Sequence, residues 1–371
     1  METRPTVAVI DTGALRHNYA ELKKSISGAA RIMAIVKANA YGHGDIESAR
    51  AFGKEGCSFY GVATVEEGAR LRAGKIDGSI IVLGGVYAGQ IKDIFDLDLT
   101  PVVFDLGTAK RINERARASG VTKKIHVKID TGMGRIGLLP EEVAPFFEGF
   151  KALSNLRLES VLSHFVEAES KDKEYTRGQL ERFLKVVEEI KSRGFTPDFI
   201  DMANSAASVD YKDAHLGLIR PGIMLYGSYP ADSFKEKITL KPALTLKTRI
   251  LHLKKVGPGF NVSYGRRFTT RKESVIATLP IGYGDGLPRK LTGIGVALIR
   301  GRRAPFAGTV CMDLTMCDCT DIPGVAVGDE AVIIGRQGTE EITAEEIAGK
   351  TGTISYEVFC NISSRVPRIY I

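Results

Sequence analysis

One lysine of this chain lies where an amine could do covalent chemistry. Lys37 follows the apolar run 33–36, which is typical of a buried strand, and precedes 38–44, which has the composition of a loop. A lysine at a strand end, partly removed from water among apolar and cationic neighbours, can have a lowered pKa and attack an aldehyde. Pyridoxal phosphate is the aldehyde cofactor that uses such an amine. Judged alone, Lys37 is more often explained as a strand-end lysine paired with a carboxylate.

Other reactive residues occupy the same kind of place, just past the end of an apolar run. They are the segment 130–135, His164, Asn204 with Ser205, and Arg220. If these runs are parallel strands closed into a barrel, their ends converge on one mouth, where barrel enzymes carry out their chemistry. The hydroxyl of Ser205 and the run 220–223 are expected to bind a phosphate, because barrels commonly hold phosphate after their last strands.

The elements that would position these residues alternate in type. From about residue 30 to 222, short apolar runs alternate with amphipathic stretches, which indicates βα units and a parallel sheet. The clearest helical stretch is 179–193, where Leu180, Phe183, Leu184, Val187 and Ile190 recur at three- and four-residue steps. Eight strand candidates predict an α/β fold, a (β/α)8 barrel of the TIM type. These candidates are 31–36, 59–63, 80–83, 101–104, 124–129, 158–163, 198–201 and 217–219.

The composition changes after about residue 230. Several later runs are rich in β-forming residues and are separated by glycine or proline, which predicts a second, mainly antiparallel β-domain. These runs are 244–256, 274–279, 296–299, 304–316 and 330–334. We therefore expect a cofactor-binding barrel at 11–235, and a β-domain made of 236–371 together with an early strand in 1–10.

The overall composition is that of a globular protein, with 371 residues of which 44% are apolar. No apolar run approaches the roughly 20 residues that span a bilayer, and the first residues lack the apolar core of a secretory signal. We therefore expect a cytoplasmic protein without a membrane partner. The net charge of +7 is spread along the chain rather than gathered with aromatic residues on one face. This distribution argues against nucleic acid and favours an anionic small molecule as the ligand.

The five cysteines predict no disulfide framework, because their number is odd and the chain is large. Cys311, Cys317 and Cys319 are close in sequence, but they have no second pair and no histidine at a ligand-like distance. We expect mostly buried thiols and no metal site. Cys311 and Met312 are expected to be core residues of a strand.

One motif points to a different class of enzyme. Residues 132–137 form a G-x-G-x-x-G pattern after a strand, with Glu159 downstream, as in nicotinamide dinucleotide-binding domains. In such domains a helix begins within the glycines, but here 138–140 intervenes and the amphipathic run starts only at Glu141. A dehydrogenase is therefore the weaker interpretation.

Nine segments resemble the motifs of one family, in the same order. AIVKANAYGHG (34–44) resembles the cofactor-lysine signature of alanine racemases. The other segments are KIDTGMGRIG (128–137), SHF (163–165), MANSAA (202–207), RPGIMLYG (220–227), SYGRRF (263–268), GYGDG (282–286), CMD (311–313) and ISYE (354–357). The resemblance covers essentially the whole chain. It implies a pyridoxal-phosphate enzyme that interconverts L- and D-alanine for bacterial peptidoglycan, as a homodimer with active sites shared across the interface.

The same resemblance implies roles for individual residues. Lys37 would hold the cofactor as a Schiff base and act as one catalytic base, and Tyr264 of the partner subunit would be the base on the opposite face. His164 would connect that tyrosine to Arg220, which would face the pyridine nitrogen and, as a guanidinium, leave it unprotonated. The remaining implied cofactor contacts are Tyr41, Asn204, Ser205, Gly222, Ile223 and Tyr356.

Substrate contacts are implied as well. Arg135 and the backbone of Met312 would bind the substrate carboxylate, and Tyr283 would narrow the entrance. Lys128 matches a position that is carbamylated in many of these enzymes, although by itself it is better explained as a buried ion-pair partner. Related decarboxylases place a carboxylate where Arg220 stands, small pyridoxal-phosphate-binding proteins lack the β-domain, and broad-spectrum racemases typically carry export signals. Turnover of serine or another small amino acid is left open.

Overall fold

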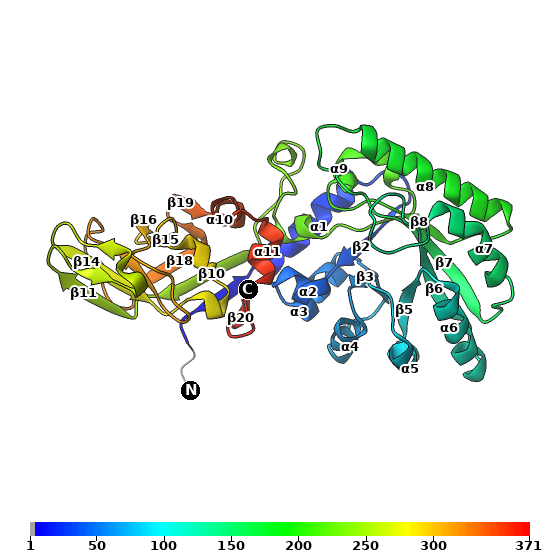
Figure 1. The fold of residues 1–371 in the computed structure, drawn as a ribbon, viewed down its shortest axis with the longest axis horizontal. Helices are drawn as coiled ribbons and strands as arrows, with labels where there is room; N and C mark the ends of the chain where they lie inside the picture. Colours follow the sequence, from blue (N-terminus) through cyan, green and yellow to red (C-terminus); the bar gives the residue numbers. More distant parts are fainter. Residues whose placement is uncertain (1–3) are drawn as a thin grey trace. The chain divides into compact units, whose positions relative to one another are not determined.

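Two compact units make up the chain. The computed structural model describes residues 4–371 (Figure 1). The barrel unit consists of Leu15–Ala40 and Asp45–Leu240, and the β unit consists of the residues up to Ala14, of Tyr41–Gly44 and of Lys241–Ile371. The predicted boundaries, 11–235 for the barrel and 1–10 with 236–371 for the β-domain, place 41–44 in the barrel. Residues 1–3 of that prediction lie outside the described residues.

Parallel strands close the predicted barrel. Within the described part of the chain the ring has eight strands, and pairing of its first with its last strand completes it. The strands are short and mostly buried, because helices cover them outside and side chains fill the barrel inside. They are β2 (Arg31–Ile35), β3 (Phe59–Val62), β4 (Ser79–Val82), β5 (Leu99–Val103), β6 (Lys123–Lys128), β7 (Leu156–Leu162), β8 (Phe199–Asp201) and β9 (Leu218–Ile219). The prediction of a (β/α)8 barrel is confirmed.

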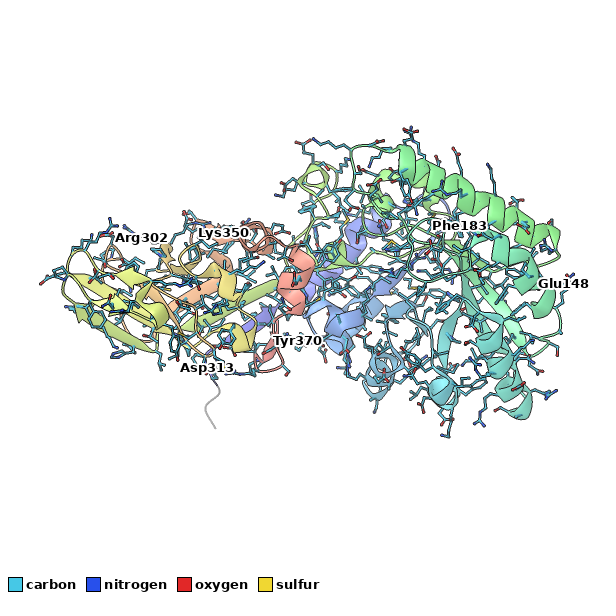
Figure 2. All side chains as sticks on the ribbon, in the orientation of Figure 1. Glu148, Phe183, Arg302, Asp313, Lys350 and Tyr370 are labelled. Atoms are coloured by element: carbon cyan, nitrogen blue, oxygen red, sulfur yellow. The ribbon has the colours of Figure 1, made fainter. Side chains whose placement is uncertain are left out.

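Helices stand around these strands in Figure 1. They are α1 (Thr12–Ser25), α3 (Asp45–Lys54), α4 (Val65–Ala73), α5 (Ile91–Asp96), α6 (Leu106–Ala118), α7 (Pro140–Phe150), α8 (Glu174–Ser192) and α9 (Ala207–Asp210). Helix α8 begins five residues before the predicted start at 179. It buries Phe183, labelled in Figure 2, and Val186, whereas Leu184, one of the recurring apolar residues of the predicted helix, is 37% exposed. Glu148 of α7 is likewise exposed, as Figure 2 shows.

The β unit is mainly antiparallel, as predicted. Its largest sheet has the order β16-β15-β18-β10-β1-β20, with β19 paired to β18, and β11, β14 and β17 form a second sheet. The early strand β1 pairs antiparallel with β10 and parallel with β20. These strands are β1 (Val7–Ile10), β10 (Leu244–Arg249), β11 (His252–Val256), β14 (Ser274–Leu279), β15 (Val296–Ile299), β16 (Arg302–Pro305), β17 (Thr315–Asp318), β18 (Glu330–Gln337), β19 (Glu340–Ile342) and β20 (Arg368–Tyr370).

Smaller elements complete the β unit. They are the strands β12 (Asn261–Val262) and β13 (Phe268–Thr269) and the helices α10 (Ala344–Thr351) and α11 (Ser355–Cys360). The predicted run 244–256 is divided into β10 and β11. The run 304–316 is not one strand, because a loop separates β16 from β17. That loop contains residues that bear on the candidate site.

The cysteines are free thiols, and Cys57, Cys317 and Cys319 are buried. Residues 4–371 contain no cluster of three metal-ligating side chains. None of the helices described is both long and apolar enough to cross a membrane.

Candidate active site

Lys37 stands at the carboxyl end of β2, at the mouth of the barrel. The amide of Val36 donates to the carbonyl of Gly61 at 2.9 Å, which continues the strand pairing up to the lysine. From Ala38 to Tyr41, φ lies between 51° and 53°, so that α2 (Lys37–Tyr41) is a left-handed turn without glycine. L-residues disfavour this conformation, and strained backbone of this kind is concentrated at functional sites.

Arg220 is buried at the same mouth and forms an ion pair with Asp201, the last residue of β8. Its guanidinium also donates to the carbonyl of Ser163, and the Ser160 hydroxyl donates to Oδ2 of Asp201 at 2.9 Å. A buried charge is stable only when it is paired and hydrogen-bonded, and both conditions are met here. Asp201 was not among the predicted site residues, although an acidic residue inside a short apolar strand is a signal of such pairing.

Positive charge dominates the electrostatics of this mouth. Burial, and then the positive charges of Arg220 and Arg135, lower the pKa of Lys128 to about 7. Burial also holds the pKa of His164 well below its usual value, and the same cations and Lys37 act in the same direction. His164 is therefore neutral at pH 7. The structure thus brings together five predicted residues that come from four different strand ends.

Four other predicted cofactor residues of the barrel unit lie after its last two strands. The amide of Gly222 donates to Oγ of Ser205 at 2.8 Å, and Ile223 begins the short helix η3 (Ile223–Tyr226). Ser205 keeps its own hydroxyl proton as a donor. Asn204 has a local role as well, because its Oδ1 accepts from the amide of Ala207 at 3.0 Å and so begins α9.

Tyr41 and Tyr356, both predicted phosphate contacts, meet in the β unit. Their ring centroids are 5.9 Å apart, with an angle of 57° between the planes. Tyr356 belongs to α11, and the same helix contributes Phe359, which packs against the ring of His43 at 5.0 Å. The segment 41–44 is therefore held in the β unit by aromatic packing. His43, for which no catalytic role was predicted, is part of that packing.

Gly42 provides a test of how tightly this segment is held. Its φ is 80°, and a Cβ there would lie 2.2 Å from the carbonyl oxygen of Phe359. Gly42→Ala is expected to lower the free energy of unfolding by roughly 2–5 kcal/mol in chemical denaturation, since a strained conformation and an overpacked contact combine. Gly28→Ala is the matched control, because φ is 67° but the space is open, and about 1 kcal/mol is expected. Equal losses at both glycines would contradict the tight contact.

The residues predicted to act on the opposite face of the cofactor, Tyr264, Tyr283 and Met312, all belong to the β unit. The hydroxyl of Thr309 donates to the carbonyl of Tyr264 at 2.7 Å, and the amide of Tyr283 donates to the carbonyl of Cys311 at 3.0 Å. The two turns that carry these tyrosines are thus fixed to one segment, 309–312. In the single chain Tyr264 is 74% exposed, Met312 52% and Tyr283 42%.

The prediction that Cys311 and Met312 are core residues of a strand was wrong. They lie in the loop between β16 and β17, where Cys311 is only partly buried and Met312 is half exposed. The Met312 carbonyl accepts from the amide of Gly284 at 2.9 Å. A short apolar segment next to a strand has the same sequence pattern whether it belongs to the strand or to a packed loop. The pattern therefore could not place Cys311 and Met312.

Comparison with known proteins gives a family for this arrangement. The family model "Alanine racemase, N-terminal domain" matches residues 10–230, and "Alanine racemase, C-terminal domain" matches residues 243–370. The chain belongs to the alanine racemase family. The alanine racemase of Halothermothrix orenii is 46% identical over 99% of this chain and 97% of its own.

Solved structures of alanine racemases have the same fold. That of Clostridium difficile 630 is 38% identical with a TM-score of 0.95, over 100% of this chain and 97% of its own. That of Bacillus anthracis, solved with bound L-Ala-P, is 35% identical with a TM-score of 0.94, over 100% of this chain and 96% of its own.

Membership of the alanine racemase family leaves the G-x-G-x-x-G pattern to be explained. The carboxylate of Asp130 accepts from the amides of Gly132, Gly134 and Arg135 at 2.8, 3.1 and 3.0 Å. Burial alone would raise the pKa of Asp130, but the hydrogen bonds from these amides outweigh burial and lower the pKa. The glycine loop therefore binds an internal carboxylate and does not offer its amides to a dinucleotide. Arg135 belongs to this loop, and its own amide is one of the three that donate to Asp130.

Proposed function

We propose that this protein is a pyridoxal-phosphate-dependent racemase that interconverts L- and D-alanine by a two-base mechanism. The observation that carries the proposal is Lys37 itself, which β2 places at a cationic barrel mouth in a chain of this family. The names of its relatives and the L-Ala-P bound to the Bacillus anthracis protein support alanine as the substrate.

The residues at the mouth suit this cofactor. Its phosphate is an anion, and cationic side chains outnumber the acidic ones that interact with them. The cations are Lys37, Lys128, Arg135 and Arg220. Of the acids there, Asp130 and Glu67 are bound by backbone amides, and Asp201 is paired with Arg220. The mouth therefore keeps excess positive charge, which favours an anionic ligand.

In this proposal each predicted residue holds a defined part of the cofactor. The phosphate contacts would be Tyr41, Ser205, Gly222, Ile223 and Tyr356, with Asn204 supporting the same loop. Arg220, which is paired with Asp201, would face the ring nitrogen. The barrel, 11–235, would hold most of the cofactor, and the β-domain, 1–10 and 236–371, would supply Tyr356 and the residues of the cofactor's opposite face.

The chemistry requires proton transfer on two faces of one carbon. When bound, pyridoxal phosphate supplies an electron-accepting ring that makes the Cα–H of an attached amino acid acidic. The Lys37 amine would take or give the proton on one face, and the hydroxyl of Tyr264 of the partner subunit on the other. Neutral His164 keeps one ring N–H, which would donate a hydrogen bond to the phenolate form of Tyr264 and so lower the pKa of a phenol whose usual pKa is about 10.

A homodimer follows from this division of labour. The side chains of Tyr264, Tyr283 and Met312 are exposed in the single chain, so a second copy can use them. Arg135 and the backbone of Met312 would bind the substrate carboxylate, and Tyr283 would limit the size of the side chain admitted.

The reaction would supply D-alanine for peptidoglycan in the cytoplasm. The cytoplasm is a reducing compartment, which suits free cysteines.

The direct test is racemisation measured in both directions. Purified protein loaded with pyridoxal phosphate should convert L-alanine to D-alanine and the reverse, followed by circular dichroism. Serine, assayed alongside, determines the breadth of the substrate range. A loaded protein that racemises no small amino acid would overturn the proposal.

Lys128 is proposed to carry a carbamate. With a pKa of about 7, much of its amine is neutral at physiological pH and can add CO2, releasing a proton. The carbamate would place an anion beside Arg135 and orient it. Removal of CO2 is therefore expected to lower the initial rate several-fold, and bicarbonate should restore it more fully at about pH 8 than at about pH 6, where the amine is protonated.

The matched control is Lys128→Ala, whose rate should not respond to bicarbonate. Isotope-labelled bicarbonate should give a carbamate signal by nuclear magnetic resonance in the wild-type protein alone. Lack of that signal, or of density beyond the amine in a well-resolved crystal structure grown with CO2, would exclude the modification.

A further inference from the structure

The turn that carries Lys37 requires stabilisation from outside itself. Four successive residues without glycine, from Ala38 to Tyr41, have φ near 52°. Each such residue costs roughly 1–2 kcal/mol relative to right-handed backbone. Hydrogen bonds within the turn do not offset this, since a right-handed turn would make equivalent ones. Contacts from other elements must therefore select the left-handed form.

Glu67 of α4 makes such contacts at the start of the turn. Its Oε1 accepts from the amide of Ala38 at 2.7 Å, and its Oε2 accepts from the amide of Ala63 at 2.7 Å. Ala38 directly follows Lys37, and Ala63 directly follows β3. One carboxylate thus joins the chain just past two neighbouring barrel strands.

The local role expected for Glu67 does not explain these bonds. Thr64 is the N-cap of α4, and its side chain accepts from the amide of Glu67, as in a capping box. In a capping box the glutamate would bond back to the amide of the N-cap residue. Here its two oxygens bind the amides of Ala63 and Ala38 instead. The carboxylate therefore acts between loops.

We propose that Glu67 is a positioning residue for Lys37. By accepting a hydrogen bond from the amide of Ala38, Glu67 fixes the left-handed turn. This turn fixes the direction in which the Lys37 side chain points at the barrel mouth. The inference rests on the proposed function, because it concerns the attachment of pyridoxal phosphate to this amine. A carboxylate suits the role because both of its oxygens accept, whereas the amide of glutamine has one acceptor and one donor group.

Glu67→Gln is the decisive variant. It has nearly the same shape, but its NH2 group must face one of the two backbone amides. Titration of pyridoxal phosphate into cofactor-free protein, followed by the absorbance of the lysine-bound cofactor, is expected to show an affinity about 10- to 100-fold lower than that of the wild type. Hydrogen exchange of the segments around Ala38 and Ala63 should become faster, while that of the other barrel strands is unchanged.

Glu66→Gln is the matched control. Glu66 is the neighbouring residue on α4, and its Oε1 accepts from the side chain of Gln90 at 2.8 Å, whereas the amides of Ala38 and Ala63 donate to Glu67. This variant should bind the cofactor like the wild type, and both cofactor-free variants should melt at nearly the same temperature. Equal affinity of the two variants, or a loss of affinity at Glu67 that is matched by lower melting of the cofactor-free protein, would overturn the positioning role. A wild-type protein that forms no lysine-bound cofactor would instead overturn the proposed function.

Discussion

Replacing Lys37 by alanine is expected to abolish both the absorbance band of protein-bound pyridoxal phosphate and racemisation. The amine is the proposed point of covalent attachment and also one of the two bases. General acid–base catalysis by one residue is worth roughly 10²–10⁴ in rate, and the loss of attachment adds to it, so activity should fall below detection in a circular dichroism assay.

Lys54→Ala is the matched control for this experiment. Lys54 is an exposed lysine on α3 of the same unit, so its loss removes one amine without changing the barrel mouth. The control should retain both the band and the activity. A Lys37→Ala protein that keeps the band would show that another amine holds the cofactor, and the assignment of Lys37 would fail.

Tyr264→Phe is expected to separate racemisation from proton exchange. Removal of one base should lower kcat/KM by about 10²–10⁴ in both directions, because the enantiomers have equal free energy in water and the two directions must change together. Lys37 would still exchange the Cα proton on its own face. In deuterated water one enantiomer should therefore take up deuterium without inversion, and the other should lose this exchange, as measured by mass spectrometry.

Tyr87→Phe is the control for loss of a phenolic hydroxyl. Tyr87 is 81% exposed on the barrel unit and belongs to none of the predicted contacts. Its variant should racemise alanine like the wild type. Turnover at the wild-type rate in both directions by Tyr264→Phe would rule out the two-base mechanism, and equal loss of exchange from both enantiomers would show that the tyrosine is not specific to one face.

The barrel and the place of Lys37 in it could be predicted because they depend on local pattern. Buried strands appear as short apolar runs and helices as a repeat of three and four residues. In any closed parallel barrel the carboxyl ends of the strands share one rim. The position of Lys37 after β2 and that of Arg220 after β9 therefore followed from order along the chain alone.

The left-handed turn after Lys37 could not be predicted in this way. None of the residues from Ala38 to Tyr41 is glycine, and local preference favours right-handed backbone at each of them. The conformation is chosen by groups distant in sequence, such as the Glu67 carboxylate on the amide of Ala38. Asn39 of the turn also accepts, through its Oδ1, from the amide of Asp45, the first residue of α3. No periodicity in the sequence indicates this contact.

The sequence by itself determined which side chains this protein brings to its barrel mouth, because strand order and motif order are properties of the chain. Only the tertiary structure decided what those side chains can do there. The pKa of Lys128 falls to about 7 and His164 stays neutral because of burial and of charges from several strands. Arg220 is directed by Asp201, which ends a different strand, β8. Burial and electrostatic interactions depend on which residues are neighbours in space, and only folding determines those neighbours.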